Sequence, residues 1–282
     1  MELEPAGIIP PDDDPVLGRH PAVARVESAL DAGRDEEALS LAEAALAAGE
    51  GDRLDLLYLA GDALLALGRA REAEVRFRAV LAEDPSCPTS RCWLAMALYR
   101  QCRFDEAKVE CDQSLAAEQA PIDAHVVRGL LLERTDDFAA ADQCFAHAAD
   151  ADPDRFHVPA RLSRREFDLQ VRLAARRLPR QFRRHLDRVP VIVQDLPALE
   201  LLRGAGDDFD PELLGLFDGT PLPDTASSVE LRPNYIYLFQ RNLERIARDR
   251  EDLIEQVSIT LYHELGHYLG LDEDDLDEMG LG

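Results

Sequence analysis

The sequence has no apolar run of the roughly 18 residues that a membrane-spanning helix requires. Its first 15 residues are acidic and rich in proline, and they have neither the basic region nor the apolar region of a secretory signal peptide. Residues 1–19 are therefore expected to form a disordered leader. The protein is expected to be cytoplasmic and to have no membrane partner.

Cysteine is scarce and does not have the spacing of a disulfide framework. There are five cysteines, an odd number, and all lie between residues 87 and 144. None belongs to a Cys-x-x-Cys pair, which argues against a thiolate metal site. Structural thiols in a reducing compartment are the interpretation that fits this pattern.

Positive charge is also in short supply. The chain has 31 Lys and Arg against 56 Asp and Glu, a formal net charge of −25. Because binding to phosphate requires basic clusters, this charge argues against nucleic acid as a partner. Residues 161–188 depart from this balance with ten Arg against three acidic residues, and residues 204–282 carry nineteen acidic and five basic residues. We interpret the arginine run as a solvated helix face, with a ligand-binding patch as the alternative.

A period of 34 residues runs through the first half of the chain. It is seen in three sets of equivalent residues: Gly61, Ala95 and Gly129; Ala73, Ala107 and Ala141; Phe77, Cys111 and Phe145. The small side chains of the first two sets let two helices of a unit approach closely. The units that start near residues 54, 88 and 122 resemble tetratricopeptide repeats. A weaker copy over residues 20–49 is predicted as a degenerate first repeat, so that residues 20–155 form an all-α solenoid.

The resemblance to tetratricopeptide repeats implies a protein partner on the concave face of the array. The residues expected on that face are Tyr58, Asp62, Met96, Tyr99, Val126 and Leu130. The alternative is that the array only packs against the rest of the chain.

Residues 156–282 do not continue the period and are expected to form a compact α+β domain. The pattern predicts one amphipathic helix over 163–186, a strand over 189–193, and a loop over 203–228. A second strand is predicted over 235–239, followed by helices over 240–248 and 250–269. The second strand is either an edge that pairs with an extended substrate or an ordinary inner strand. The whole chain is therefore α+β, and mostly α.

The last predicted helix contains the sequence His263-Glu264-Leu265-Gly266-His267, an HExxH motif. Residues four apart share one helical face, so both imidazoles can bind one metal ion. Glu264 is offset by one residue and is predicted to act as the general base. Asp249 is the expected N-cap, and Gly270 lies where the helix is expected to end. Two histidines and a carboxylate indicate zinc, one ion per chain, as the cofactor.

A catalytic zinc site needs a third protein ligand. Glu273 lies at the third-ligand position of the spacing HExxHxxGxxH/D, and Asp272 and Asp274 flank it as alternatives. Otherwise this acidic cluster is a solvated tail. We predict that one carboxylate, Glu273, binds the metal together with His263 and His267.

Residues 163–282 resemble a small bacterial family of zincin-like metallopeptidases. The resemblance rests on four blocks in order: residues 187–197 (DRVPVIVQDLP), 213–219 (LLGLFDG), 233–239 (PNYIYLF) and 257–276. The family's motif is HExxHxxGxxD, whereas this chain has Glu273 in place of the aspartate. The resemblance implies a zinc-dependent peptidase that acts on a protein or peptide substrate. The alternatives are an interaction module whose metal site is structural or catalytically weak, and a hydrolase for a substrate other than a peptide.

Overall fold

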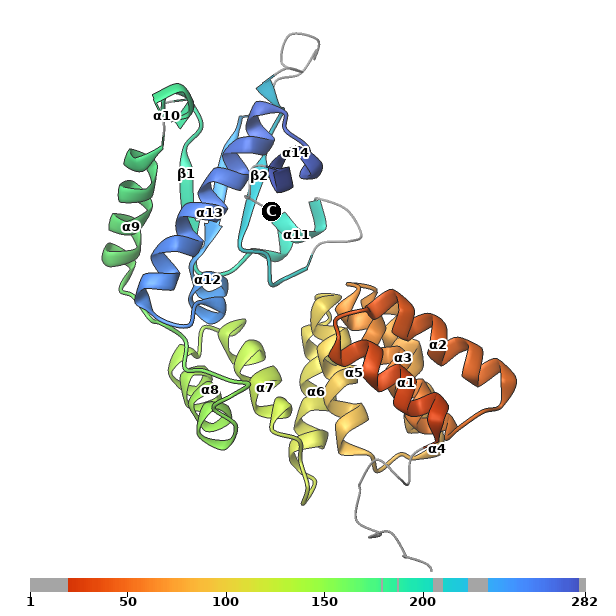
Figure 1. Ribbon diagram of the computed structural model, residues 1–282. Coiled ribbons are helices and arrows are strands. Elements are labelled where there is room, and N and C mark those ends of the chain that lie inside the picture. The colour runs from red at the N-terminus through yellow and green to blue at the C-terminus, as the bar shows by residue number, and fades with distance from the viewer. Residues whose placement is uncertain (1–19, 179, 187, 205–209, 223–232, 279–282) are drawn as a thin grey trace, which may run out of the picture. The chain divides into compact units, whose positions relative to one another are not determined.

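The computed structural model describes residues 20–178, 180–186, 188–204, 210–222 and 233–278, so the expected leader lies outside these ranges. The chain divides into two compact units, Met1–Leu98 and Tyr99–Gly282, whose helices and strands Figure 1 shows. The boundary expected near residue 156, where the repeats give way to another fold, stays a prediction. None of the described helices is long and apolar enough to cross a lipid bilayer.

Helices follow one another through the first half of the chain, as the 34-residue period predicts. They are α1 (Pro21–Asp31), α2 (Asp35–Ala48), α3 (Arg53–Ala66), α4 (Ala70–Glu83), α5 (Pro88–Arg100), α6 (Phe104–Leu115), α7 (Asp123–Glu133) and α8 (Phe138–Ala151). The predicted N-terminal helical solenoid is confirmed. The expected degenerate repeat over 20–49 corresponds to the helix pair α1 and α2.

Glycine in the first helix of a unit makes room for an aromatic ring of the second. A Cβ atom on Gly61 would lie 2.7 Å from the ring of Phe77, and one on Gly129 would lie 2.6 Å from the ring of Phe145. Both rings are buried, with exposed fractions of 0% and 5%. The close approach predicted from the small residues is therefore present in both units.

The turn between the two helices of a unit has the same backbone conformation each time. Gly68, Cys102 and Asp136 are spaced by 34 residues and have φ angles of +73°, +58° and +60°. Glycine adopts this left-handed conformation freely, whereas Cys102 and Asp136 adopt it at a cost of about 1 kcal/mol or more. The backbone of the turn is therefore the same in these units even where the side chain is not.

Two of the residues expected on the concave face are part of the core. Tyr99 is 0% exposed and Leu130 is 2% exposed, so the prediction that they contact a partner was wrong. Tyr58, Asp62, Met96 and Val126 are only partly buried and remain candidates. The helical period alone could not separate these two groups, because it gives the face of a helix but not what packs on it.

The C-terminal part of the chain is the small α+β domain that the sequence predicts. Its helices are α9 (Arg164–Arg177), α10 (Arg180–Leu186), α11 (Leu199–Gly204), α12 (Gln240–Ile246), α13 (Arg250–Leu269) and α14 (Glu273–Glu278). Its strands are β1 (Val191–Gln194), β2 (Gly215–Asp218) and β3 (Tyr235–Phe239).

The three strands form a sheet in the order β1-β3-β2. β1 runs parallel to β3, with Val193 opposite Leu238, and β2 runs antiparallel to it, with Gly215 also opposite Leu238. β3 is thus an inner strand, which decides against the interpretation of residues 235–239 as a substrate-binding edge. One face of the sheet contributes Ile236 and Leu238 to a core shared with α9 and α13.

Two sequence predictions about this domain were wrong. The helix expected over 163–186 is two helices, since α9 ends at Arg177 and Leu178 is extended (φ −52°, ψ 137°). The next residue in the sequence is Pro179, and the ring of a proline disfavours the helical conformation in the residue before it. The loop expected over 203–228 contains strand β2. Four residues that begin with glycine are too weak a strand signal to outweigh the Gly, Pro and Asp around them.

Candidate metal centre

The HExxH motif lies in the last two turns of α13, as predicted. The Oδ1 of Asp249 accepts hydrogen bonds from the backbone N–H groups of Glu251 (2.8 Å) and Asp252 (3.0 Å), which caps the N-terminus. At the other end Gly270 has φ +85° and its N–H donates to the carbonyl of His267. One face of the helix is in the domain core, through Leu253, Val257, Leu261 and Leu265.

The two histidines of the motif converge on one point. The Nε2 atoms of His263 and His267 lie 2.9 Å apart, and their rings are nearly perpendicular, with centroids 4.6 Å apart. Two imidazole nitrogens on one tetrahedral zinc, each at about 2.0–2.1 Å from it, are roughly 3.3 Å apart. The pair therefore fits a shared zinc ion after a movement of a few tenths of an ångström.

Glu264 is held against strand β2. Its exposed fraction is 6%, and a Cβ atom on Gly215 would lie 2.8 Å from its Cγ and Oε1 atoms. The same Cβ would lie 2.7 Å from Cγ2 of Thr260, one turn earlier on α13. Only glycine at the start of β2 leaves room for the carboxylate there. Sequence analysis missed Gly215, although glycine inside a strand is a known sign of close approach.

After Gly270 the chain turns back onto α13. Leu276 on α14 is 0% exposed, and its side chain occupies the space where a Cβ on Gly266 would be. Figure 1 shows α9 and α14 on opposite flanks of α13. The glycine inside the motif therefore lets α14, which begins at Glu273, pack closely against α13.

The acidic residues after the motif have different surroundings. Asp272 caps α14, because its Oδ1 accepts from the N–H of Asp275 at 2.9 Å, while its own N–H donates to Oδ2 of Asp275 at 3.3 Å. Asp274 is exposed. The side chain of Glu273 lies outside the described part of the chain, and the described residues contain no group of three His, Cys, Asp or Glu around one point. Glu273 as the third ligand stays a prediction.

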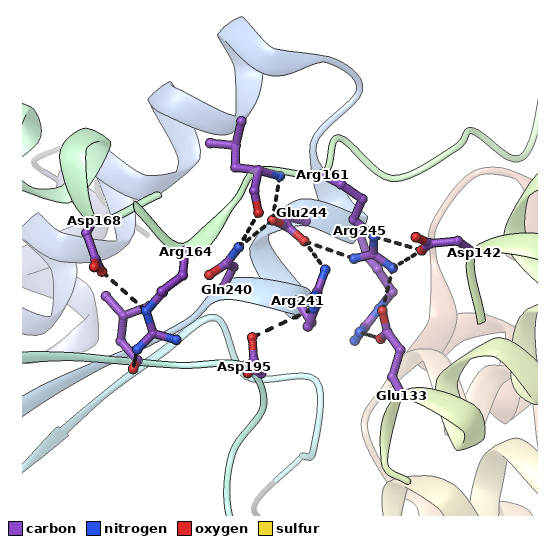
Figure 2. A network of polar contacts seen from close by, with 12 residues as sticks. Glu133, Asp142, Arg161, Arg164, Asp168, Asp195, Gln240, Arg241, Glu244 and Arg245 are labelled. Atoms are coloured by element: carbon purple, nitrogen blue, oxygen red, sulfur yellow. Dashed lines mark hydrogen bonds and ion pairs between the residues drawn. The ribbon is translucent and has the colours of Figure 1, made fainter. Parts of the chain in front are cut away.

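A buried group of charged side chains joins α7 and α8 to α12, as Figure 2 shows. The guanidinium of Arg161 contacts Glu133 (Nη2–Oε1, 2.6 Å), Asp142 (Nη2–Oδ1, 2.6 Å) and Glu244 (Nη1–Oε2, 3.0 Å). Glu133 also pairs with Arg245. The side chains of Glu133 and Glu244 are 0% exposed, so their ion pairs are shielded from water, whereas the side chain of Asp142 is 40% exposed.

Glu244 also fixes the segment that leads into α9. Its Oε1 accepts from the N–H of Leu162 (2.9 Å) and from Nε2 of Gln240 (2.7 Å), and its Oε2 accepts from Arg241 (3.0 Å). The backbone carbonyl of Glu244 accepts from the N–H of Ala160 at 3.1 Å. A single buried carboxylate thus links α12 to the connection between α8 and α9.

A further set of hydrogen bonds leads from this group towards the metal centre. Nη2 of Arg245 donates to Oδ1 of Asn242 at 2.6 Å. The Nδ2 of Asn242, which is 1% exposed, donates to the carbonyls of Pro211 (2.9 Å) and Leu213 (2.6 Å). These carbonyls lie just before Gly215, the residue that contacts Glu264. Asn242 thereby fixes the segment that leads into β2. The sequence contains no signal for this role.

Comparison with protein families confirms both resemblances seen in the sequence. Residues 186–282 match the family described as zincin-like metallopeptidase. Residues 64–131 and 122–155 match two families of tetratricopeptide repeats. No curated protein matches the chain in sequence.

Two of the solved structures that match the chain are described as TPR proteins. TTC0263 of Thermus thermophilus is 20% identical, over 54% of this chain and 78% of that one, with a TM-score of 0.43. YrrB, described as a TPR protein with an unusual peptide-binding site, is 21% identical over 47% and 68%, with a TM-score of 0.39. MamA is 15% identical over 45% and 74%, with a TM-score of 0.38. Similarities at this level say nothing about the function of this chain.

Proposed function

We propose that this chain, which joins tetratricopeptide repeats to a zincin-like metallopeptidase domain, is a zinc-dependent peptidase. Its repeats bind a protein substrate or partner. The observation that carries the proposal is the arrangement on α13. Two imidazole nitrogens lie 2.9 Å apart, and Glu264 on the same helix is held against Gly215. A purely structural metal site would have no need of this third residue.

His263 and His267 are the residues that would hold the metal, with Glu273 as the third ligand. When bound, zinc lowers the pKa of a coordinated water towards neutrality and polarises a carbonyl group. His263 and His267 would bind the metal through the lone pairs of their Nε2 atoms, which lie 2.9 Å apart.

Glu264 performs the proton transfers in this proposal. Its carboxylate accepts a proton from the attacking water and then donates it to the nitrogen of the leaving amine, so that one residue serves as base and acid. The contact with Gly215 fixes the direction of the carboxylate. A fixed direction matters because a general base must lie within hydrogen-bonding reach of the proton it removes.

The repeats are proposed to bring the substrate to the enzyme. Solenoid arrays present an extended face whose partly exposed side chains contact other proteins. In this chain Tyr58, Asp62, Met96 and Val126 are the partly exposed candidates among those expected from the sequence. Replacing them with alanine and capturing partners on the inactive enzyme would test this part of the proposal.

Metal content and peptide cleavage test the proposal directly. We expect about one zinc per chain by elemental analysis of the wild type, and no zinc in the variant His263→Ala/His267→Ala. Glu264→Gln is expected to keep its zinc and to lose roughly 10²- to 10⁴-fold in cleavage rate. Glu255→Gln, an exposed glutamate on the same helix, is the matched control and is expected to behave as the wild type.

Two results would contradict the proposal. Full activity in Glu264→Gln would exclude the carboxylate as the base. A wild type that binds no metal even when zinc is supplied would exclude a metallopeptidase, and would favour an interaction protein that carries a zincin-like domain.

A further inference from the structure

The outer face of α9 is basic in a protein that is strongly acidic overall. Arg165, Arg172 and Arg176 are exposed and, with spacings of seven and four residues, lie on one side of the helix. The opposite side contributes Phe167 and Val171 to the domain core. The exposed side is therefore a continuous basic stripe along α9.

The arginines of this stripe have no acidic partner in the described part of the chain, whereas several other exposed arginines do. Arg34, Arg69 and Arg103 each pair with a glutamate three residues later. By contrast, Arg165, Arg172, Arg176 and Arg177 form no ion pair with any carboxylate in the described part of the chain. With 56 acidic residues available against 31 basic ones, a group of unneutralised guanidinium groups on one helix is unexpected for a solvated surface.

Two leucines lie on the same face. Leu169 and Leu173 are 46% and 36% exposed, and their spacing of four residues places them one above the other between the arginines. Single exposed apolar residues are common on protein surfaces. A pair of leucines flanked by unpaired arginines, however, offers both an apolar contact and several hydrogen-bond donors to one ligand.

We propose that this face of α9 docks an acidic peptide segment that also carries apolar side chains. Its carboxylates would accept hydrogen bonds from Arg172 and Arg176, for which the guanidinium fork is well shaped. An apolar side chain would pack on Leu169 and Leu173. From Arg165 to Arg176 the stripe is about 17 Å long from the rise of an α-helix, which matches roughly five residues of extended chain.

Charge favours a short peptide over a larger polyanion. The net charge of −25 repels an anionic bilayer or a nucleic acid duplex as it approaches, since both extend beyond the stripe. A peptide of a few residues contacts only the helix and avoids most of this repulsion. Because α9 packs against α13 in one core, the docked segment is held on the domain that contains Glu264. That the docked segment belongs to a substrate rests on the proposed peptidase function. The docking of an acidic segment on α9 does not depend on that function.

Binding of a synthetic probe tests the proposal. The probe is a fluorescently labelled twelve-residue peptide of alternating Glu and Leu, compared with a version that has Gln in place of Glu. Affinity is measured by fluorescence anisotropy with the full chain carrying Glu264→Gln, so that the result does not depend on cleavage. The wild-type stripe is expected to bind the Glu peptide at least fivefold more tightly than the Gln peptide, and to lose affinity with added salt.

Matched variants locate the binding site. Arg172→Glu is expected to weaken binding of the Glu peptide at least fivefold, since it removes one charge contact and adds a repulsion. Arg25→Glu is the control, because Arg25 is also an exposed helical arginine without an ion pair in the described residues, and it should change affinity less than twofold. Leu173→Ala, which keeps every charge, is expected to weaken binding as well. Circular dichroism checks that each variant is folded.

Three outcomes would overturn the proposal: no measurable binding of the Glu peptide by the wild type, equal weakening by Arg172→Glu and Arg25→Glu, or equal affinity for the Glu and Gln peptides. Arginine-dependent sedimentation with anionic phospholipid vesicles, in the absence of peptide binding, would assign the stripe to a membrane surface instead. Peptide docking by a wild type that binds no metal even when zinc is supplied would leave this inference standing and refute only the peptidase.

Discussion

Replacing Glu133 with glutamine tests whether the last repeat and the zincin-like domain fold as one unit. The carboxylate of Glu133 is 0% exposed and contacts two guanidinium groups, those of Arg161 and Arg245, which are 19% and 10% exposed. Glutamine has nearly the same size but no charge. Both arginines would then stay buried with one negative charge fewer to offset their positive charges. Removal of one partner from a buried ion pair typically costs about 3–5 kcal/mol.

The expected loss can be compared with that of an exposed ion pair. Lys108 and Asp112 form such a pair, at 67% and 44% exposure, and Asp112→Asn should cost less than about 1 kcal/mol. Hydrogen exchange followed by mass spectrometry reports the opening of each helix separately. A cost of 3–5 kcal/mol corresponds to a roughly hundredfold to several-thousandfold increase in the opening equilibrium.

The informative comparison is between α7, which contains Glu133, and α13, which contains the HExxH motif. If they belong to one cooperative unit, Glu133→Gln should accelerate exchange in both helices by a similar factor. Acceleration in α7 with unchanged exchange in α13 would show that the last repeat and the zincin-like domain open independently. The reasoning from the buried ion pairs would then be refuted.

Two further substitutions follow from the geometry. Gly215→Ala places a Cβ atom 2.8 Å from the carboxylate of Glu264. We therefore expect at least a roughly tenfold loss of peptide cleavage, with unchanged zinc content by elemental analysis. Unchanged cleavage would show that the carboxylate is not held by β2. Cys102→Gly removes the strain of a left-handed backbone conformation (φ +58°). It is expected to raise the free energy of unfolding by about 0.5–1 kcal/mol, which is measured as a higher Tm. A lower Tm would mean that the contacts of the thiol outweigh the backbone strain.

Much of the repeat fold could be predicted because its information is local. The 34-residue spacing of Gly61 and its equivalents predicts the helix pairs, and the position of Gly68 predicts the turn. The same holds for α13, where Asp249 and Gly270 mark the two ends and the spacing of His263 and His267 indicates the metal-binding face. Each of these features depends on residues within one or two turns of helix.

The features that could not be predicted depend on contacts between distant segments. Glu133 and Glu244 are acidic residues on helices, and in the sequence they resemble the many solvated carboxylates of this chain. Only the fold brings Arg161 between them. The role of Gly215 likewise depends on the approach of Glu264. The role of Asn242 depends on hydrogen bonds to the carbonyls of a segment about thirty residues earlier.

The buried ion pairs of Glu133 also limit how the repeat array can grow. Arrays of this kind lengthen by duplication of whole repeats, because each repeat contacts only its neighbours. An extra repeat between α2 and α3 would leave every contact of Glu133 and Asp142 intact. An extra repeat after α8 would separate these two carboxylates from Arg161 and leave buried charges without partners. We therefore expect an extra repeat between α2 and α3 to be tolerated, and an extra repeat between α8 and the zincin-like domain to destabilise the protein.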